Sequence, residues 1–263
     1  MSSTPRRRTP RGGPAAVLLL ALGLLSGCTG APDPAPPPTT SVAPSPTTEP
    51  TPTPTPDPNL AIIATAADDA IDVYAEPDAR TPELTVAAED VVSIPGEIPL
   101  TFLVIEQQGD WLHVHLPVRP NGSTGWVRAD EVALASTDYH IEVRLTEHRL
   151  LLHKGDEVVM EAPVGVGRAE VPTPGGTYYI KELLQPPTPG GTYGAYAYGL
   201  SGYSPVLESF AGGQGVIGIH GTNQPESVGT DASHGCIRML DADITRLVTE
   251  FGLPLGTPVE IVE

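Results

Sequence analysis

The chain of 263 residues carries 32 acidic and 14 basic side chains, a formal net charge of −18. This excess of negative charge argues against nucleic-acid binding, and against attachment to polyphosphate or anionic membranes through a basic patch. The 31 prolines and 28 glycines disfavour a helix-rich fold. Two cysteines are too few for a disulfide scaffold or a multi-cysteine zinc ribbon.

Residues 1–28 have the layout of an export signal. A basic stretch at 6–11 precedes an apolar run at 15–25, which is too short to span about 30 Å of hydrocarbon. The sequence Leu-Ser-Gly-Cys at 25–28 resembles the bacterial lipobox, and the alternative is an ordinary signal peptide that contains a cysteine. The resemblance implies lipidation of Cys28 and an exported protein, lipid-anchored to the outer face of the cytoplasmic membrane and facing the cell wall.

Residues 29–59 are expected to form a Pro/Thr-rich disordered linker. Twelve prolines and seven threonines fall between residues 31 and 58, with almost no apolar side chain to bury. At about 3.1 Å per residue, such a spacer holds a domain up to roughly 90 Å from its anchor.

Residues 60–136 contain runs typical of β-strands at 99–106, 111–116 and 124–127, separated by turn signals. The pattern Gly-Asp-Trp-Leu-x-Val at 109–114, followed by Gly-Trp-Val-x-Ala at 125–129, resembles bacterial SH3-like domains. It implies a small SH3-like β-barrel. His113 and His115 share one side of a predicted strand, and surface or packing roles are favoured over a metal pair because no third ligand is near.

Residues 138–263 are expected to form a second domain. A strand-like run at 139–152, a turn at 153–156 and a return at 157–164 predict a hairpin. Asp241 is a plausible N-cap for a helix that runs through Phe251 and closes at Gly252. Residues 255–262 are then a final strand.

Two sequence features of this domain predict loops. The heptapeptide Pro-Thr-Pro-Gly-Gly-Thr-Tyr occurs at 172–178 and again at 187–193, and each copy is expected to lie beside a strand. Four tyrosines fall in a glycine-rich stretch that is either a mobile lid over a cleft or a tight hairpin packed by aromatic rings. They are Tyr193, Tyr196, Tyr198 and Tyr203.

Cys236 and His220 are the candidate reactive residues. If Cys28 is lipidated, Cys236 is the one thiol left in an exported protein, where an unpaired cysteine is buried, metal-bound or catalytic. An adjacent imidazole can take the thiol proton, and flanking glycines let backbone N–H groups approach a substrate carbonyl. A core cysteine or a Cys/His metal site, with His234 as a further ligand, remains open on these residues alone.

The sequences His-Gly-Thr-Asn at 220–223 and Ser-His-Gly-Cys-Ile-Arg at 233–238 resemble the signature of YkuD-type L,D-transpeptidases. The similarity extends over about 139–263 and includes the Thr-Pro-x-Gly entry to a strand at 173–176. Position 238 is arginine where other members carry asparagine. The resemblance implies a mainly β chain, with an SH3-like barrel followed by a β-sandwich catalytic domain that has a short helix.

The family resemblance also implies the chemistry. Cys236 would be the nucleophile, His220 the general base and acid, and the backbone carbonyl of Gly221 would orient the imidazole. His234 and Gly235 would lie beside the oxyanion, and Arg238 would orient a substrate carboxylate. The substrates would be peptidoglycan stem peptides, joined by 3→3 cross-links through a cysteine thioester, with no metal or cofactor; carbapenems would acylate Cys236.

Three other functions are compatible with the same residues. Water as the acyl acceptor would make the protein an L,D-carboxypeptidase. An inactive transferase domain would leave a wall-binding lipoprotein that acts through its SH3-like region. A Cys/His metal-binding protein would use Cys236, His220 and His234, and would carry stoichiometric zinc.

Overall fold

The computed structural model describes residues 59–188, 190–210 and 213–263, all of which belong to one compact unit. The expected signal peptide, Cys28 and all of the expected linker except residue 59 lie outside the described residues. No helix within the described ranges is long and apolar enough to cross a membrane.

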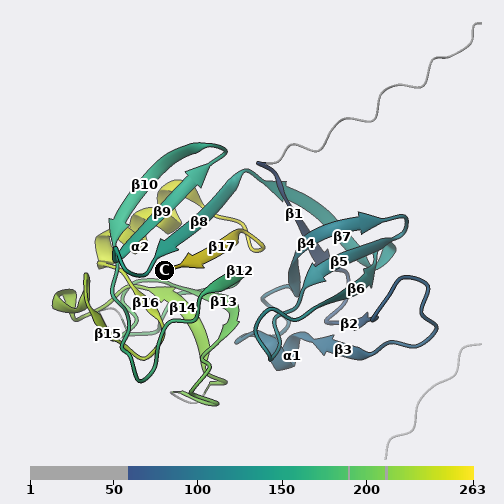
Figure 1. Cartoon of the computed structure of the whole chain (residues 1–263), viewed down its shortest axis with the longest axis horizontal. Coiled ribbons are helices and arrows are strands. Elements are labelled where there is room, and N and C mark those ends of the chain that lie inside the picture. Colours follow the sequence, from purple (N-terminus) through teal and green to yellow (C-terminus); the bar gives the residue numbers. More distant parts are fainter. Residues whose placement is uncertain (1–58, 189, 211–212) are drawn as a thin grey trace, which may run out of the picture. The chain divides into compact units, whose positions relative to one another are not determined.

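The described chain is mainly β, as the sequence predicted. Residues 61–137, here called the N-terminal β region, form a five-stranded antiparallel sheet in the order β6-β5-β4-β1-β7 and a hairpin of β2 and β3 (Figure 1). Helices α1 (Ala88–Val91) and η1 (Ala129–Glu131) connect them. The strands are β1 (Ala61–Ala66), β2 (Ala70–Val73), β3 (Leu84–Ala87), β4 (Thr101–Gln108), β5 (Trp111–His115), β6 (Thr124–Arg128) and β7 (Val132–Thr137).

The strands expected at 99–106, 111–116 and 124–127 correspond to β4, β5 and β6. In β5, the alternating apolar side chains Leu112 and Val114 are fully buried, which is why this face joins the core of the region. His113 stacks on Trp126 with ring centroids 4.8 Å apart, a packing role of the kind expected. The SH3-like assignment of this region stays a prediction.

Residues 139–262, here called the C-terminal β region, form an eight-stranded mixed sheet in the order β10-β9-β8-β17-β12-β13-β14-β16 (Figure 1). The buried apolar side chains of this region form a second hydrophobic core, separate from the core of the N-terminal β region. The strands of this sheet are β8 (Tyr139–Arg144), β9 (Arg149–Lys154), β10 (Glu157–Pro163), β12 (Gly176–Leu184), β13 (Ala197–Tyr203), β14 (Val216–His220), β16 (Ile237–Arg238) and β17 (Pro258–Val262). Strands β11 (Val166–Gly167) and β15 (Asp231–Ser233) pair in parallel as a separate two-stranded sheet.

The expectation of one continuous strand at 139–152 is wrong. The chain turns between β8 and β9, where His148 takes a positive φ of 53° and its N–H donates to the carbonyl of Leu145. The result is a three-stranded meander of β8, β9 and β10 rather than a single hairpin. The apolar alternation continues on both sides of the turn, so the hydrophobic pattern alone does not reveal it.

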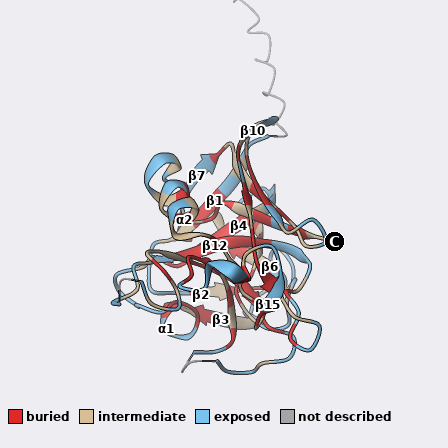
Figure 2. Ribbon diagram, turned by 90° about the vertical axis from the view of Figure 1, so that its left-hand side faces the viewer, coloured by how far each residue is buried: buried red, intermediate tan, exposed pale blue. Residues whose placement is uncertain are grey.

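The predicted helix is present, with a different start. Helix α2 (Asp241–Arg246) continues into a π-helical turn, η3 (Leu247–Phe251), and Gly252 ends it in the left-handed conformation with φ 58°. Leu240, and not Asp241, occupies the N-cap position, so Asp241 is the first helical residue. Buried residues concentrate in the strands, whereas the loops and the outer face of α2 are largely exposed (Figure 2).

Both copies of the repeated heptapeptide lie beside strand β12. The first leads into it, and the described residues of the second follow it, before β13. The four tyrosines divide between the two expected alternatives: Tyr198 and Tyr203 are buried in β13, as in a packed hairpin, while Tyr193 and Tyr196 precede the strand.

Candidate active site

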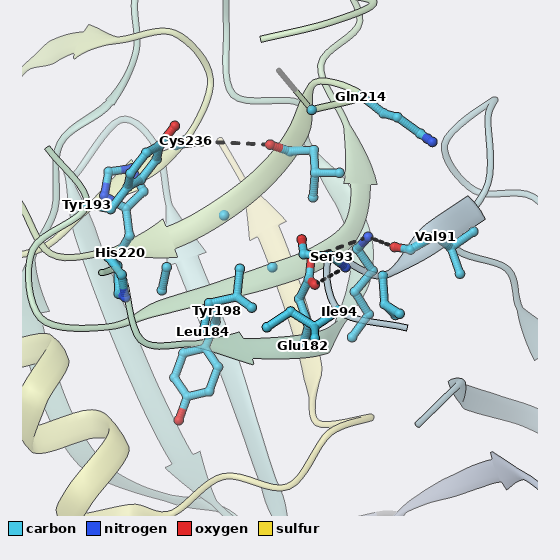
Figure 3. A pocket seen from close by; sticks show the side chains of 18 of the residues that line it. Val91, Ser93, Ile94, Glu182, Leu184, Tyr193, Tyr198, Gln214, His220 and Cys236 are labelled. Atoms are coloured by element: carbon cyan, nitrogen blue, oxygen red, sulfur yellow. Dashed lines mark hydrogen bonds and ion pairs between the residues drawn. The ribbon is translucent and has the colours of Figure 1, made fainter. Parts of the chain in front are cut away.

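Strands β14 and β16 bring His220 and Cys236 to one place. The two strands pair in parallel, with Ile219 opposite Ile237 and His220 opposite Arg238. Cys236 immediately precedes β16 and His220 ends β14, so residues 16 apart in sequence line the same cavity (Figure 3). The apolar residues Ile217, Ile219 and Ile237 anchor both strands in the core.

His220 is held as a neutral base. Its side chain is 3% exposed, and Nδ1 donates to the carbonyl of Gly221 at 2.5 Å, which leaves Nε2 as the basic nitrogen. Burial lowers the pKa of His220 to about 4; the hydrogen bond to Gly221 and the charge of Asp241 oppose this shift, while Arg238 adds to it. The imidazole is therefore unprotonated near neutral pH.

Cys236 is a free thiol at the same cavity, only partly exposed. Burial raises the pKa of the thiol, while the N–H of Gly218 and the charge of Arg238 oppose the increase. The sulfur makes a long contact of 3.9 Å to the carbonyl of Val216. A raised thiol pKa and a lowered imidazole pKa describe a neutral Cys236 and a neutral His220 at the same cavity, not a thiolate and an imidazolium.

Ser233 stabilises the turn before Cys236 by two hydrogen bonds. Ser233 Oγ accepts from the N–H of Gly235 at 3.1 Å and donates to the carbonyl of Cys236 at 2.6 Å. Gly235 has φ 109°, which side chains other than glycine rarely adopt. Because its N–H is already engaged, the expected oxyanion contact of Gly235 requires this bond to Ser233 to be exchanged.

The other predicted site residues, Gly221, His234, Gly235 and Arg238, do not line the cavity. His234 stacks on Phe210 with ring centroids 5.3 Å apart, and burial and the nearby arginines Arg168 and Arg238 lower its pKa. Arg238 Nη1 donates to Gln224 Oε1 at 3.1 Å, and its buried Nε has no partner among the described residues.

Gly221 lies against the start of helix α2. A Cβ at Gly221 would overlap Asp241 Oδ1, and the same oxygen accepts from the N–H of Ala195 at 3.3 Å. Gly194, with φ 63°, packs directly on Gly221. The packing of Gly194 and of the Asp241 carboxylate against Gly221 thus positions the Gly221 carbonyl, which holds His220.

The cavity at Cys236 has a volume of about 700 Å³. Tyr193, from the tyrosine-rich stretch, meets the ring of His220 edge-on, with centroids 4.9 Å apart. Burial, and next the charge of Cys236, raise the pKa of Tyr193. Residues 89–94 of the N-terminal β region and the buried pair Lys181 and Glu182 also line the cavity (Figure 3), and no sequence pattern marked them.

Within the described ranges, no three His, Cys, Asp or Glu side chains gather closely enough to hold a metal ion.

Residues 138–261 match the family of L,D-transpeptidase catalytic domains known as YkuD. The match makes this segment similar to L,D-transpeptidase catalytic domains, and it covers less than half of the chain. The chain is 37% identical over 123 residues to the YkuD protein of Bacillus subtilis (strain 168), designated a candidate L,D-transpeptidase. The match covers 47% of this chain and 65% of that protein, and the YkuD protein of Bacillus licheniformis gives the same figures.

Solved structures include similar chains. Bd1075 of Bdellovibrio bacteriovorus is 27% identical with a TM-score of 0.37, and the match covers 48% of each chain. L,D-transpeptidase 3 of Mycobacterium tuberculosis, solved with a faropenem-derived adduct, is 16% identical with a TM-score of 0.39, over 53% of this chain and 73% of that one. With TM-scores below 0.5, neither structure adds to the sequence match.

Proposed function

We propose that the protein is a peptidoglycan L,D-transpeptidase that joins stem peptides by 3→3 cross-links through a thioester on Cys236. The observation that carries this proposal is that Cys236 lines the same cavity as His220, a buried imidazole whose Nδ1 is committed to the carbonyl of Gly221. A neutral imidazole beside a protonated thiol is an arrangement in which proton transfer accompanies nucleophilic attack.

The first half-reaction acylates the enzyme. Cys236 Sγ attacks the carbonyl between the third residue of a stem tetrapeptide and its terminal D-alanine, while Nε2 of His220 accepts the thiol proton. The carbon–nitrogen bond breaks, His220 returns the proton to the departing amine, and D-alanine leaves. A thioester and a neutral imidazole remain.

The second half-reaction transfers the acyl group. The side-chain amine of a second stem attacks the thioester and gives its proton to His220. The carbon–sulfur bond breaks, the sulfur takes the proton back from His220, and the 3→3 peptide bond is formed. The thiol and the neutral imidazole are regenerated, so one residue serves both half-reactions.

The surrounding residues have supporting roles in this proposal. The Gly221 carbonyl keeps the proton on Nδ1 of His220, which leaves Nε2 facing the chemistry. Backbone N–H groups of the 234–236 turn stabilise the oxyanion, once the Gly235 N–H exchanges its bond to Ser233. Arg238, whose buried Nε has no partner in the described chain, orients a substrate carboxylate.

The proposal places the enzyme outside the cytoplasmic membrane. Lipidation of Cys28 anchors it, the Pro/Thr-rich linker at 29–59 spans the distance to the wall, and an SH3-like region precedes the catalytic domain. A carbapenem acylates Cys236 in the same way as a stem peptide, because its strained amide presents a carbonyl to the thiol.

Intact-mass spectrometry tests the proposal. The chain with Cys28→Ser, in which Cys236 is the only cysteine, is mixed with a disaccharide tetrapeptide and followed over time. We expect a covalent adduct on Cys236, release of D-alanine and a cross-linked dimer, and no adduct with Cys236→Ala. Decay to tripeptide alone would establish the carboxypeptidase instead, and an alkylatable thiol that never forms an adduct would favour a wall-binding protein.

A further inference from the structure

Residues 89–94 of the N-terminal β region lie at the cavity that contains Cys236 and His220. They include the end of helix α1 and the segment after it, and Val91, Ser93 and Ile94 lie beside Glu182 at one side of the cavity (Figure 3). One boundary of a cavity formed largely by the catalytic domain is thus supplied by a segment more than 120 residues away from the nucleophile in sequence.

A buried ion pair holds this segment. Lys181 and Glu182 on β12 are 3% and 2% exposed, and Lys181 Nζ lies 3.5 Å from Glu182 Oε1. Lys181 Nζ donates to the carbonyl of Val91, and Glu182 Oε2 accepts from the N–H of Ser93 at 2.7 Å. Two charged groups that would be expensive to bury alone are satisfied by each other and by the backbone of the wall.

A second set of contacts ties the same wall to the rim of the cavity. Gln214 lies beside the cavity, and its Nε2 donates to the carbonyl of Asp90 at 2.9 Å. Arg119 of the N-terminal β region donates to the carbonyls of Ser204, Leu207 and Gln214 at 2.8–3.0 Å. The rim that leads into β14, and so to His220, therefore depends on the N-terminal β region too.

Asn121 fixes the region against β13 by imitating a strand partner. Its side-chain amide donates to the carbonyl of Tyr203 at 2.8 Å and accepts from the N–H of Tyr203 at 2.9 Å. The Tyr203 hydroxyl donates to the carbonyl of Pro117 at 2.6 Å. Two bonds to the backbone N–H and carbonyl of one residue, and a third from its side chain, define a single docking geometry.

We infer that residues 89–94 form a wall of the substrate cavity, and that Lys181 and Glu182 are positioning residues that fix this wall beside Cys236. The N-terminal β region then helps to select the peptide that reaches the thiol, and does more than carry the catalytic domain. The inference rests on the proposed function only where it names that peptide as a peptidoglycan stem.

The test replaces the pair by apolar residues, Lys181→Met with Glu182→Leu, in the Cys28→Ser chain. Replacing a buried ion pair by apolar side chains of similar volume is often neutral for stability, so the fold is expected to survive. The matched control is Arg246→Met with Glu250→Leu, which removes an exposed ion pair on helix α2 and η3 far from the wall contacts.

Three measurements distinguish a displaced wall from a damaged reactive site. Hydrogen exchange of the Ser93 amide should accelerate at least about tenfold in the double variant, because its acceptor is gone. The KM for the stem peptide should rise about tenfold with kcat changed less than about twofold, because the wall positions substrate without touching the thiol. Alkylation of Cys236 by iodoacetamide should stay unchanged, while alkylation by the bulkier pyrenyl maleimide should accelerate.

The first and third readouts do not require transpeptidase activity. If the natural chain does not turn over stem peptide, the proposed function fails while exchange and alkylation still decide the inference. The inference is wrong if hydrogen exchange of the Ser93 amide is unchanged in the double variant. It is also wrong if this exchange accelerates while the ratio of the pyrenyl maleimide and iodoacetamide rates stays the same. Should the double variant not fold, Gln214→Ala removes one exposed contact to the same wall and must shift that ratio in the same direction.

Discussion

At the scale of single residues, burial decides what the motif can do. The sequence indicates that Cys236 and His220 belong together, because a histidine, a glycine turn and a cysteine recur in a known signature. Their protonation states are not visible in the sequence. They depend on how deeply the fold buries each side chain, because burial lowers the pKa of His220 at the end of β14 and raises the pKa of Cys236 just before β16.

Replacing His220 by alanine should slow acylation of Cys236 by stem peptide at least about 10²-fold, because the thiol loses its proton acceptor. Stopped reactions analysed by intact mass measure this rate. Alkylation by iodoacetamide at alkaline pH, where the thiol ionises without help, should change less than about threefold. A parallel loss in both reactions would mean that the substitution damaged the site rather than removed a base.

At the scale of elements, glycines in one loop set the position of the imidazole. Strands β4, β5, β6, β10 and β17 could be predicted from the sequence, but the turn between β8 and β9 and the packing of Gly194 on Gly221 could not. Both depend on backbone conformations, at His148 and at Gly194, that leave no periodic signature in side-chain polarity. The glycine-rich surroundings of Tyr193 are visible in the sequence, whereas its contact with His220 depends on the fold.

Gly194→Ala should reduce acylation at least about tenfold. The added Cβ would overlap Asp241 Oδ1 and Gly221 Cα, so the carbonyl that holds His220 must move. Gly190→Ala is the matched control, because it has a similar φ of 69° in the same loop and nothing within 4 Å. Both variants bear backbone strain of about 1–2 kcal/mol. Equal rates for the two alanine variants would show that the contact with Gly221 does not matter.

At the scale of the whole molecule, the cavity belongs to both β regions. The division into two domains near residue 137 stays a prediction, while the presence of alternating apolar strands in both regions follows from the sequence. The wall at 89–94 does not, because the contact of Ser93 with Glu182 joins residues 89 positions apart and involves backbone atoms. Sequence patterns that report local structure carry no signal for such a contact.

The buried histidine should make global stability depend on pH. The pKa of His220 falls from its ordinary 6.5 to about 4 on folding. The free energy of unfolding is therefore not reduced by this residue above about pH 6.5, where the imidazole is neutral in both states. As pH falls from about 6.5 through about 4, the unfolded chain takes up this proton first, and the free energy of unfolding decreases by roughly 3 kcal/mol at most. Urea unfolding of the natural chain and of His220→Asn across this range measures it, and parallel curves would refute the depressed pKa.

Deleting residues 31–58 should separate catalysis from reach. If this segment is a spacer, turnover of a soluble tetrapeptide should stay within about twofold of the natural chain, while cross-linking in cells falls. Equal losses in the two assays would contradict a spacer role.

The ultraviolet absorbance of the thiolate tests whether Cys236 and His220 are both neutral, with the imidazole acting as general base. The difference spectrum between the Cys28→Ser chain and the same chain carrying Cys236→Ser isolates this one thiol. No thiolate absorbance is expected at about pH 7, and it should appear only above the ordinary thiol pKa, because burial raises the pKa of Cys236. Thiolate absorbance at about pH 5–7 would reveal a preformed ion pair with protonated His220 and would contradict the neutral state of both residues.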